Sequence, residues 1–207
     1  ADYFPPDKAI SGSLTTGNLA QSFQADLFTG KASYIYSIGV PAGRKDLQSN
    51  LNLIHSSQSG NSWCGVGWTL ELGSIYRSTK RGIPKYDNSD TYIFSINGAE
   101  SELVNIGGNE YRTKIESEFM KFCFNGIYWE LIDKTGTKYR LGYNIDSKVT
   151  NVKGIYRWCI DRVSDIFGNY MTISYTRDQG ENYLSQIRYT GNDVQGNHDG
   201  RQQRHRA

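Results

Sequence analysis

The feature that most constrains this chain is its lack of helical periodicity, combined with short apolar runs that end at glycine-containing turns. No window of ten or more residues repeats its apolar positions at helical spacing. Asn97-Gly98 and Asn125-Gly126 each separate two runs rich in aromatic and β-branched residues, and Asn-Gly is a strong hairpin turn signal. The pattern predicts an all-β fold: an antiparallel meander of many short strands and hairpins that forms a β-sandwich or a curved shell segment.

The length of 207 residues is sufficient for one good-sized core or two small ones. The 15 tyrosines suit half-buried strands, and the 22 glycines suit many tight turns. We expect an extended leader over residues 1–22, a β domain over 23–190, and a polar tail or truncation point over 191–207. Within the domain we expect about twelve short strands, the first two forming a hairpin, and one turn of helix near 116–121.

Two later segments share a sequence pattern. Residues 128–139 and 157–170 each contain an aromatic strand-like run, then Asp-x-x-Gly, then a run with tyrosine. An aspartate can accept a hydrogen bond from the backbone two residues on, and glycine supplies the positive φ that such a turn needs. The two copies suggest an internal repeat that is built around one kind of turn.

Charge and hydropathy exclude several classes of partner. The net charge of +2 produces no strong field to attract nucleic acid or an anionic membrane. No run approaches the ~20 apolar residues of a membrane span, so direct membrane insertion is not expected. The N-terminal residues lack a basic segment followed by an apolar one, and the sequence therefore shows no secretory signal.

The potential metal ligands are few and scattered. Cys64, Cys123 and Cys159 are odd in number and widely spaced, which argues against a disulfide framework and predicts three small buried hydrophobes. With no Cys-x-x-Cys pair and three histidines in all, the sequence predicts no metal and no cofactor. The aspartates of the 146–165 region match no calcium loop, and we interpret Asp146, Asp161 and Asp165 as turn and surface carboxylates.

Glycine alternates with bulky residues in one short segment. Gly65 and Gly67 are each followed by a larger side chain, which indicates a strand packed closely against another backbone. We expect both glycines to be intolerant of substitution because a side chain would clash with the neighbouring strand. Trp68, Trp129 and Trp158 are expected to pack in the core.

Several motifs, in order along the chain, resemble a known family. Residues 38–53 are similar to I-x-x-P-x-G-R-x-x-L-x-P-x-L-x-L, except that Ser49 stands where proline is common. Residues 60–70 are similar to G-N-G-x-x-G-x-G-W-S-L, and residues 75–87 to I-x-R-x-T-x-x-G-x-P-x-Y-D. The matching positions that we single out as structural are Pro41, Gly43, Arg44, Gly65, Gly67, Trp68, Arg77, Gly82, Pro84, Tyr86 and Asp87.

These motifs resemble the SpvB family, which comprises the N-terminal region of a Salmonella virulence protein and of the B subunits of insecticidal Tc toxin complexes. The resemblance implies a secreted, β-rich wall element that helps to enclose a toxic segment in a hollow cocoon. It also implies three partners: the remainder of the toxin B chain, an Rhs-repeat C subunit and, indirectly, a pore-forming A subunit. We accordingly expect a structural module and not an enzyme.

Two other functions are compatible with the sequence. A carbohydrate-binding module would use exposed aromatic rings, and Trp63, beside a polar loop, is the best candidate for such a platform. An ADP-ribosyltransferase would use an arginine, a Ser-Thr-Ser motif and a Glu-x-Glu pair, for which the chain offers Arg44, Ser78-Thr79-Lys80 and Glu116-Ser117-Glu118. The enzyme is the weaker alternative because Lys80 replaces the last serine and Glu100-Ser101-Glu102 is a second chance copy of the pair.

Overall fold

The computed structural model of the chain describes residues 23–25, 32–39, 43, 47, 51–57, 60–62, 64–70, 72–96, 99–115 and 120–193. These residues form seventeen strands and one short 3₁₀ turn, η2 (Ile145–Ser147). The all-β prediction is therefore confirmed. The strands are more numerous than the sequence pattern indicated, since several of them are only two or three residues long.

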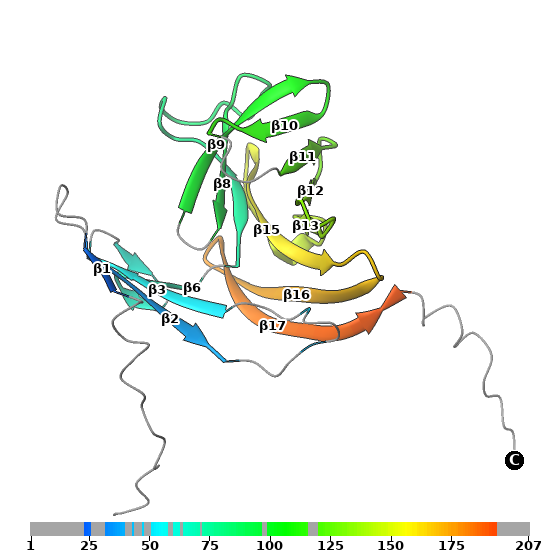
Figure 1. Ribbon diagram of the computed structural model, residues 1–207. Helices are drawn as coiled ribbons and strands as arrows, with labels where there is room; N and C mark the ends of the chain where they lie inside the picture. Colours follow the sequence, from blue (N-terminus) through cyan, green and yellow to red (C-terminus); the bar gives the residue numbers. More distant parts are fainter. Residues whose placement is uncertain are drawn as a thin grey trace, which may run out of the picture.

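A four-stranded antiparallel sheet comes first along the chain (Figure 1). Its order is β1-β2-β3-β6, and β1 and β2 form the hairpin expected from the sequence. Trp68 on β6 is half-buried and lies beside His55, with 4.9 Å between ring centroids, so it packs within this sheet and not in the main core. The strands are β1 (Phe23–Ala25), β2 (Ala32–Ile38), β3 (Leu51–Ser56) and β6 (Trp68–Leu70), with β4 (Asn61–Ser62) and β5 (Gly65–Val66) as a two-stranded ribbon.

The remaining strands form one large sheet that begins as a meander. From β7 to β13 each strand pairs antiparallel with the next, and the β11–β12 hairpin turns at the predicted Asn125-Gly126. Asn97-Gly98, between β8 and β9, lies outside the described residues. These strands are β7 (Ser74–Arg77), β8 (Tyr92–Ile96), β9 (Ala99–Gly107), β10 (Glu110–Thr113), β11 (Lys121–Phe124), β12 (Trp129–Ile132) and β13 (Lys138–Leu141).

Strand β15 closes this meander into a ring. One edge of β15 pairs with β7, where Trp158 lies opposite Ile75, and the other edge pairs with β13, where Val163 lies opposite Tyr139. The curved sheet closes on itself and is barrel-like, which makes the expected β-sandwich or curved shell segment more specific. The last strands are β14 (Lys148–Asn151), β15 (Gly154–Ser164), β16 (Asn169–Asp178) and β17 (Glu181–Asn192), and the long β16–β17 hairpin extends the sheet beyond the ring (Figure 1).

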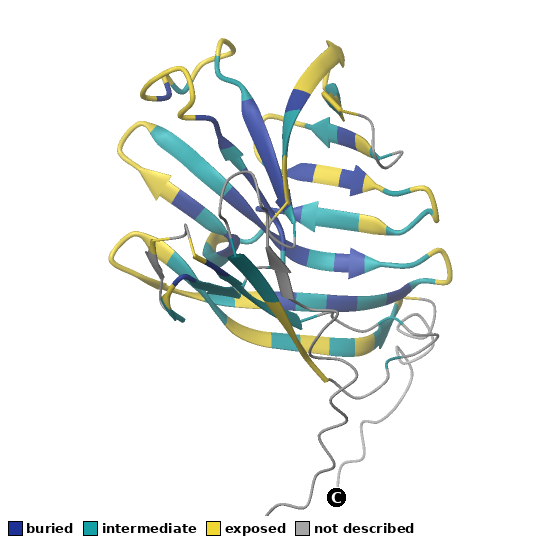
Figure 2. Ribbon diagram, turned by 60° about the vertical axis from the view of Figure 1, so that its left-hand side comes forward, coloured by how far each residue is buried: buried dark blue, intermediate teal, exposed yellow. Residues whose placement is uncertain are grey.

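The interior of the ring is filled by the inward face of each strand. In β12, Trp129 and Leu131 are buried while Glu130 and Ile132 are exposed, which is the alternation that a half-buried strand requires (Figure 2). Trp129 and Trp158 are both buried, as expected from the sequence. The core comprises Ile75, Tyr92, Phe94, Leu103, Phe122, Trp129, Leu131, Leu141, Trp158, Ile160, Val163, Met171 and Ile173.

The two Asp-x-x-Gly segments form matching turns. In the β12–β13 connection, Asp133 Oδ1 accepts hydrogen bonds from the backbone N–H of Thr135 and Thr137. In the β15–β16 connection, Asp165 Oδ1 accepts them from Phe167 and Asn169, which occupy the same positions in the turn. Each glycine has positive φ, 83° at Gly136 and 77° at Gly168. The repeated sequence pattern therefore specifies one turn geometry twice.

The cysteines and the predicted helical turn differ in part from expectation. All three cysteines are free thiols; Cys159 is buried, but Cys64 and Cys123 are only half-buried. Burial raises the pKa of the Cys64 thiol. The helical turn expected near 116–121 falls mostly on residues 116–119, outside the described residues, and Lys121 begins β11.

Only one of the two expected glycine clashes is present. A Cβ on Gly67 would lie 2.8 Å from His55 Nε2 and 3.0 Å from the Ser56 carbonyl oxygen, and φ is +77°. A Cβ on Gly65 would meet nothing closer than Trp68 Cδ1 at 3.9 Å, so the clash expected there is wrong. Positive φ, +112°, is the constraint that remains at Gly65.

We predict that Gly67→Ala lowers the free energy of unfolding by about 1–3 kcal/mol, because alanine would be strained at this φ and its Cβ would press on the β3 backbone. Thermal and urea denaturation followed by circular dichroism would measure the loss. Gly60→Ala is the matched control, since a Cβ there meets nothing within 4 Å and its φ is not in the left-handed range. Equal stability of the two variants would contradict the prediction.

Candidate functional site

The third family motif, residues 75–87, is organised around the buried side chain of Arg77 at the end of β7. Its Nη1 contacts Asp90 Oδ2 at 2.7 Å, and its Nε donates a hydrogen bond to the Ile155 carbonyl at 2.9 Å. The guanidinium carbon lies between 5.0 and 5.6 Å from the ring centroids of three aromatic residues, Tyr86, Tyr92 and Trp158. Arg77 therefore connects the ring closure, the 78–91 loop and the aromatic core.

Asp90, near the C-terminal end of the same loop, holds the loop in place through hydrogen bonds to its backbone. Its two carboxylate oxygens accept hydrogen bonds from the backbone N–H of Lys85 and Tyr86, both at 2.7–2.8 Å. Burial by itself would raise the pKa of Asp90, but these two N–H groups and the Arg77 guanidinium together hold the pKa below its ordinary value of 3.8. The charged carboxylate is thus the form that the folded loop requires.

The remaining motif residues shape the loop between these anchors. Pro84 is buried, and Gly82 adopts a φ of 109°, which glycine tolerates best. Tyr86 has a φ of 65°, and its hydroxyl is hydrogen-bonded by the Asn151 side chain. Asp87 is exposed and accepts hydrogen bonds from the backbone and hydroxyl of Ser89. All five residues from Arg77 to Asp87 that the sequence singled out therefore lie in one loop cluster.

The other predicted residues lie elsewhere. Gly65 lies in β5 and Trp68 in β6, and Gly67 joins these two strands. Gly43 is half-buried, whereas Pro41, Arg44 and Trp63 lie outside the described residues. The motif positions therefore form at least two separate groups, each of which shapes its own sheet.

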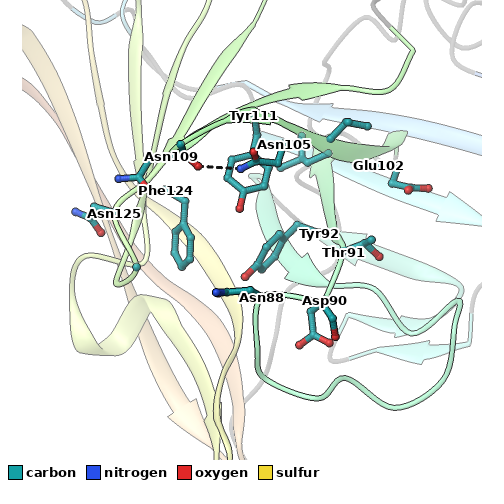
Figure 3. A pocket seen from close by; sticks show the side chains of 15 residues that line it. Asn88, Asp90, Thr91, Tyr92, Glu102, Asn105, Asn109, Tyr111, Phe124 and Asn125 are labelled. Atoms are coloured by element: carbon teal, nitrogen blue, oxygen red, sulfur yellow. Dashed lines mark hydrogen bonds between the residues drawn. The ribbon is translucent and has the colours of Figure 1, made fainter.

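A cavity of about 710 Å³ opens beside the Arg77 cluster; we call it the Phe124 hollow (Figure 3). Its wall combines the rings of Tyr92, Tyr111 and Phe124 with the side-chain amides of Asn88, Asn109 and Asn125. The hydroxyl groups of both tyrosines point toward the space in front of the Phe124 ring (Figure 3). Sequence reasoning missed this hollow because its residues come from five separate segments between 88 and 126.

A second cavity, of about 730 Å³, lies between the N-terminal sheet and the β16–β17 hairpin. Its charged groups are partly paired: Arg157 Nη1 lies 3.6 Å from Glu181, and the Tyr76 hydroxyl donates to Glu100 at 2.5 Å. Two buried polar atoms in its wall, Arg157 Nε and Asn182 Oδ1, have no hydrogen-bond partner among the described residues. This cavity is therefore a cleft of mixed charge.

Asp161 is a further buried carboxylate, and its interpretation from the sequence as a turn or surface carboxylate is wrong. The side chain is fully buried and pairs with Arg140 Nε at 2.7 Å. Its other oxygen accepts hydrogen bonds from the backbone N–H of Tyr143 and Asn144 and from the Ser147 hydroxyl. It is therefore an internal anchor for the 142–147 loop and not a surface carboxylate. A signal was present in the sequence, since Asp161 interrupts the apolar run of β15.

Only some of the residues considered for ADP-ribosyl transfer lie in the described part of the chain. Arg44 and the pair Glu116–Glu118 lie outside the described residues. The Ser78 hydroxyl accepts a hydrogen bond from the Lys80 backbone, and Glu102 pairs with Lys114 at 3.6 Å. Within the described part of the chain, no cluster of three His, Cys, Asp or Glu residues could hold a metal ion, and no helix is long and apolar enough to cross a membrane.

The closed sheet, its aromatic core and the Arg77 loop that packs against them define the class of protein as an all-β module. Residues 27–206 match the family described as SpvB, Salmonella virulence plasmid 65kDa B protein, and the chain belongs to that family. The match covers most of the sequence and includes the motif residues from Pro41 to Asp87. The family predicted from the ordered motifs is thus confirmed.

Curated relatives match over a short segment. Two proteins named mono(ADP-ribosyl)transferase SpvB, from Salmonella choleraesuis (strain SC-B67) and Salmonella enteritidis, are each 46% identical to this chain over 43 residues. The aligned segment is 21% of this chain and 7% of each relative. The chain thus matches only a small part of those proteins.

Solved structures show the same fold. The N-terminal domain of effector protein SpvB from Salmonella typhimurium strain LT2 aligns with a TM-score of 0.63 at 22% identity, covering 74% of this chain and 63% of that one. The crystal structure of TcdB2-TccC3 aligns with a TM-score of 0.70 at 20% identity, covering 81% of this chain and 10% of that one. A Photorhabdus luminescens Tc holotoxin pore aligns with a TM-score of 0.64, covering 77% and 9%.

Acid should destabilise the fold through Asp90 and the turn carboxylate Asp133. Burial would raise the pKa of Asp133, but hydrogen bonds from Thr135, Thr137 and Tyr139 lower it. A carboxyl group with a depressed pKa in the folded state contributes its full stability above its unfolded pKa, near 3.8, and loses it as pH falls through the folded pKa. We therefore predict a melting temperature that is nearly constant near neutrality and falls below about pH 4.

Asp90→Asn tests the contribution of Asp90 to this acid sensitivity. The variant should lose about 3 kcal/mol at pH 7, because Arg77 is left buried without its charged partner, and its stability should depend less on pH below 4. Asp178→Asn is the control, since that carboxylate is exposed and makes no hydrogen bond or ion pair with the described residues. Melting curves from pH 3 to 7 measure both effects. An acid slope as steep in Asp90→Asn as in the parent would refute the role given to Asp90.

Proposed function

We propose that this chain is a structural wall module of a secreted bacterial toxin shell, and that it is not itself an enzyme. The observation that supports this most directly is the shared fold with about a tenth of the TcdB2-TccC3 chain, together with membership of the SpvB family. In this proposal the wall helps to enclose a toxic segment before delivery. Its partners are the remainder of its own B chain and an Rhs-repeat C subunit, with a pore-forming A subunit contacted indirectly.

The internal use of charge is consistent with a passive role. Arg77 with Asp90 and Arg140 with Asp161 are buried or half-buried pairs that hold loops to the ring, and both carboxylates have additional backbone donors. Groups that are fully committed in this way are poorly placed to transfer protons to a substrate. Such pairs instead fix the conformation of the loops around a rigid panel.

Strand β17 offers the edge along which a wall could continue. It is twelve residues long and, among the described residues, pairs only with β16. A long unpaired edge exposes backbone donors and acceptors that readily pair with another strand. We infer that in the assembled shell a neighbouring strand of the B chain pairs with β17.

Hydrogen–deuterium exchange tests this use of the β17 edge. In the 207-residue chain, the alternate amides of β17 that point away from β16 should exchange rapidly. In a full-length shell protein that contains this module, those amides should become protected by at least tenfold because they would donate to a new strand. The internal strand β16 is the control and should change little. Unchanged exchange along β17 would rule out the edge as a junction.

The absence of enzymatic activity is a separate prediction. The purified chain should not consume NAD above the rate of buffer alone, and Glu118→Gln should leave that rate unchanged. High-performance liquid chromatography of NAD and nicotinamide measures both. NAD turnover that Glu118→Gln abolishes would establish the transferase and overturn this part of the proposal. The shell role would then have to coexist with catalysis.

A further inference from the structure

We propose that the Phe124 hollow binds a short, neutral oligosaccharide. Its volume of about 710 Å³ is within the ~300–1,000 Å³ typical of small-molecule sites. This inference goes beyond the wall function, which requires no ligand. It also assigns the sugar site to residues other than Trp63, the platform expected from the sequence, which lies outside the described residues.

The aromatic part of the site is the accessible part of the half-buried Phe124 ring. Phe124 stacks on Trp129, with 4.5 Å between centroids and 20° between planes, so one face of Phe124 is covered from behind. Tyr92 and Trp158 also pack against Phe124, with 5.7 and 5.5 Å between centroids, but the residue is only half-buried and lines the hollow, so part of its ring remains accessible to a ligand (Figure 3). The face of an aromatic ring carries partial negative charge, which attracts the polarised C–H groups on the face of a sugar.

The polar part of the site consists of amides with free hydrogen-bonding capacity. Asn88 and Asn109 are exposed, and within the described chain their side chains form no hydrogen bond. Asn125 uses only its oxygen, which accepts from the backbone N–H of Ile127 and Tyr128, so its NH₂ group is free. The amides of Asn88 and Asn109 offer donors and an acceptor, and that of Asn125 offers donors alone. Adjacent sugar hydroxyls both donate and accept hydrogen bonds, so they can pair with such amides.

The charges of the hollow favour a neutral ligand. Asp90 and Glu102 are its only charged lining residues among those described; Asp90 is paired with Arg77, and Glu102 lies 3.6 Å from Lys114. No lysine or arginine lines the wall, so a phosphate, sulfate or carboxylate would be desolvated without a counter-charge. Asn105, by contrast, is committed to its own turn through Gly107 and Gly108 and is not assigned to the ligand.

The test uses the complete 207-residue chain on an array of neutral oligosaccharides of glucose, galactose, mannose and N-acetylglucosamine, with sialylated and sulfated counterparts. We expect at least one neutral oligosaccharide to bind, with an affinity that does not change between low and high salt. Titration of that oligosaccharide should also alter tryptophan fluorescence, because Trp129 lies directly behind Phe124. Binding to acidic glycans alone, or no binding to any neutral glycan, would overturn the proposal.

Matched variants locate the site. The double variant Asn88→Ala/Asn109→Ala should weaken binding by about tenfold or more, because it removes two protein amide groups that hydrogen-bond to the ligand. Tyr111→Phe should also weaken binding while keeping the ring that packs on Trp129. Gln186→Ala on exposed β17 and Tyr128→Phe, neither of which lines the hollow, should bind as the parent does. Equal affinity in all variants, with melting temperatures unchanged, would place the sugar elsewhere and refute this site.

Discussion

The closure of the large sheet by β15 is the constraint on which the rest of the structure depends. This single strand contacts β7 and β16 along one edge and β14 and β13 along the other. Without it, β7 and β13 would be open edges and the inward faces of the meander would face water. Closure removes two edges and encloses one aromatic core, which is the general way in which antiparallel sheets avoid edge pairing. The long sequence separation between β7 and β15 also explains why closure cannot be read from local pattern.

The buried charges act on this closed frame. Arg77 bridges β7 to the start of β15 through the Ile155 carbonyl and holds the 78–91 loop through Asp90. The ion pair of Arg140 and Asp161 likewise connects β13 to β15. A buried pair is weak evidence for stability by itself, since desolvation opposes the attraction. Here the additional backbone donors to both aspartates satisfy the remaining lone pairs, and the pairs specify loop conformation.

The sequence predicted what is local and missed what is long-range. The strand class, the β1–β2 hairpin, the Asn125-Gly126 turn and the two Asp-x-x-Gly turns depend on neighbours within a few residues, and each was predicted correctly. The family could be recognised because its motifs occur in order. Ring closure, the burial of Asp161 and the Phe124 hollow depend on which distant strands pair. The local pattern of apolar and polar residues does not specify those pairings. The expected clash at Gly65 failed for the same reason, since the distance to the facing strand is a tertiary quantity.

The hollow follows from the same architecture that makes a wall. Phe124 and Trp129 lie on paired positions of β11 and β12, and their rings stack in the core, while Phe124 is only half-buried and also lines the hollow. The surrounding asparagines lie in turns, where asparagine is favoured because its side chain hydrogen-bonds to the nearby backbone. When the turns of adjacent hairpins gather at one end of a ring, their amides surround whatever ring face lies there. A rigid panel can thus acquire a recognition site without new elements, because turn chemistry supplies the polar groups and the core supplies the platform.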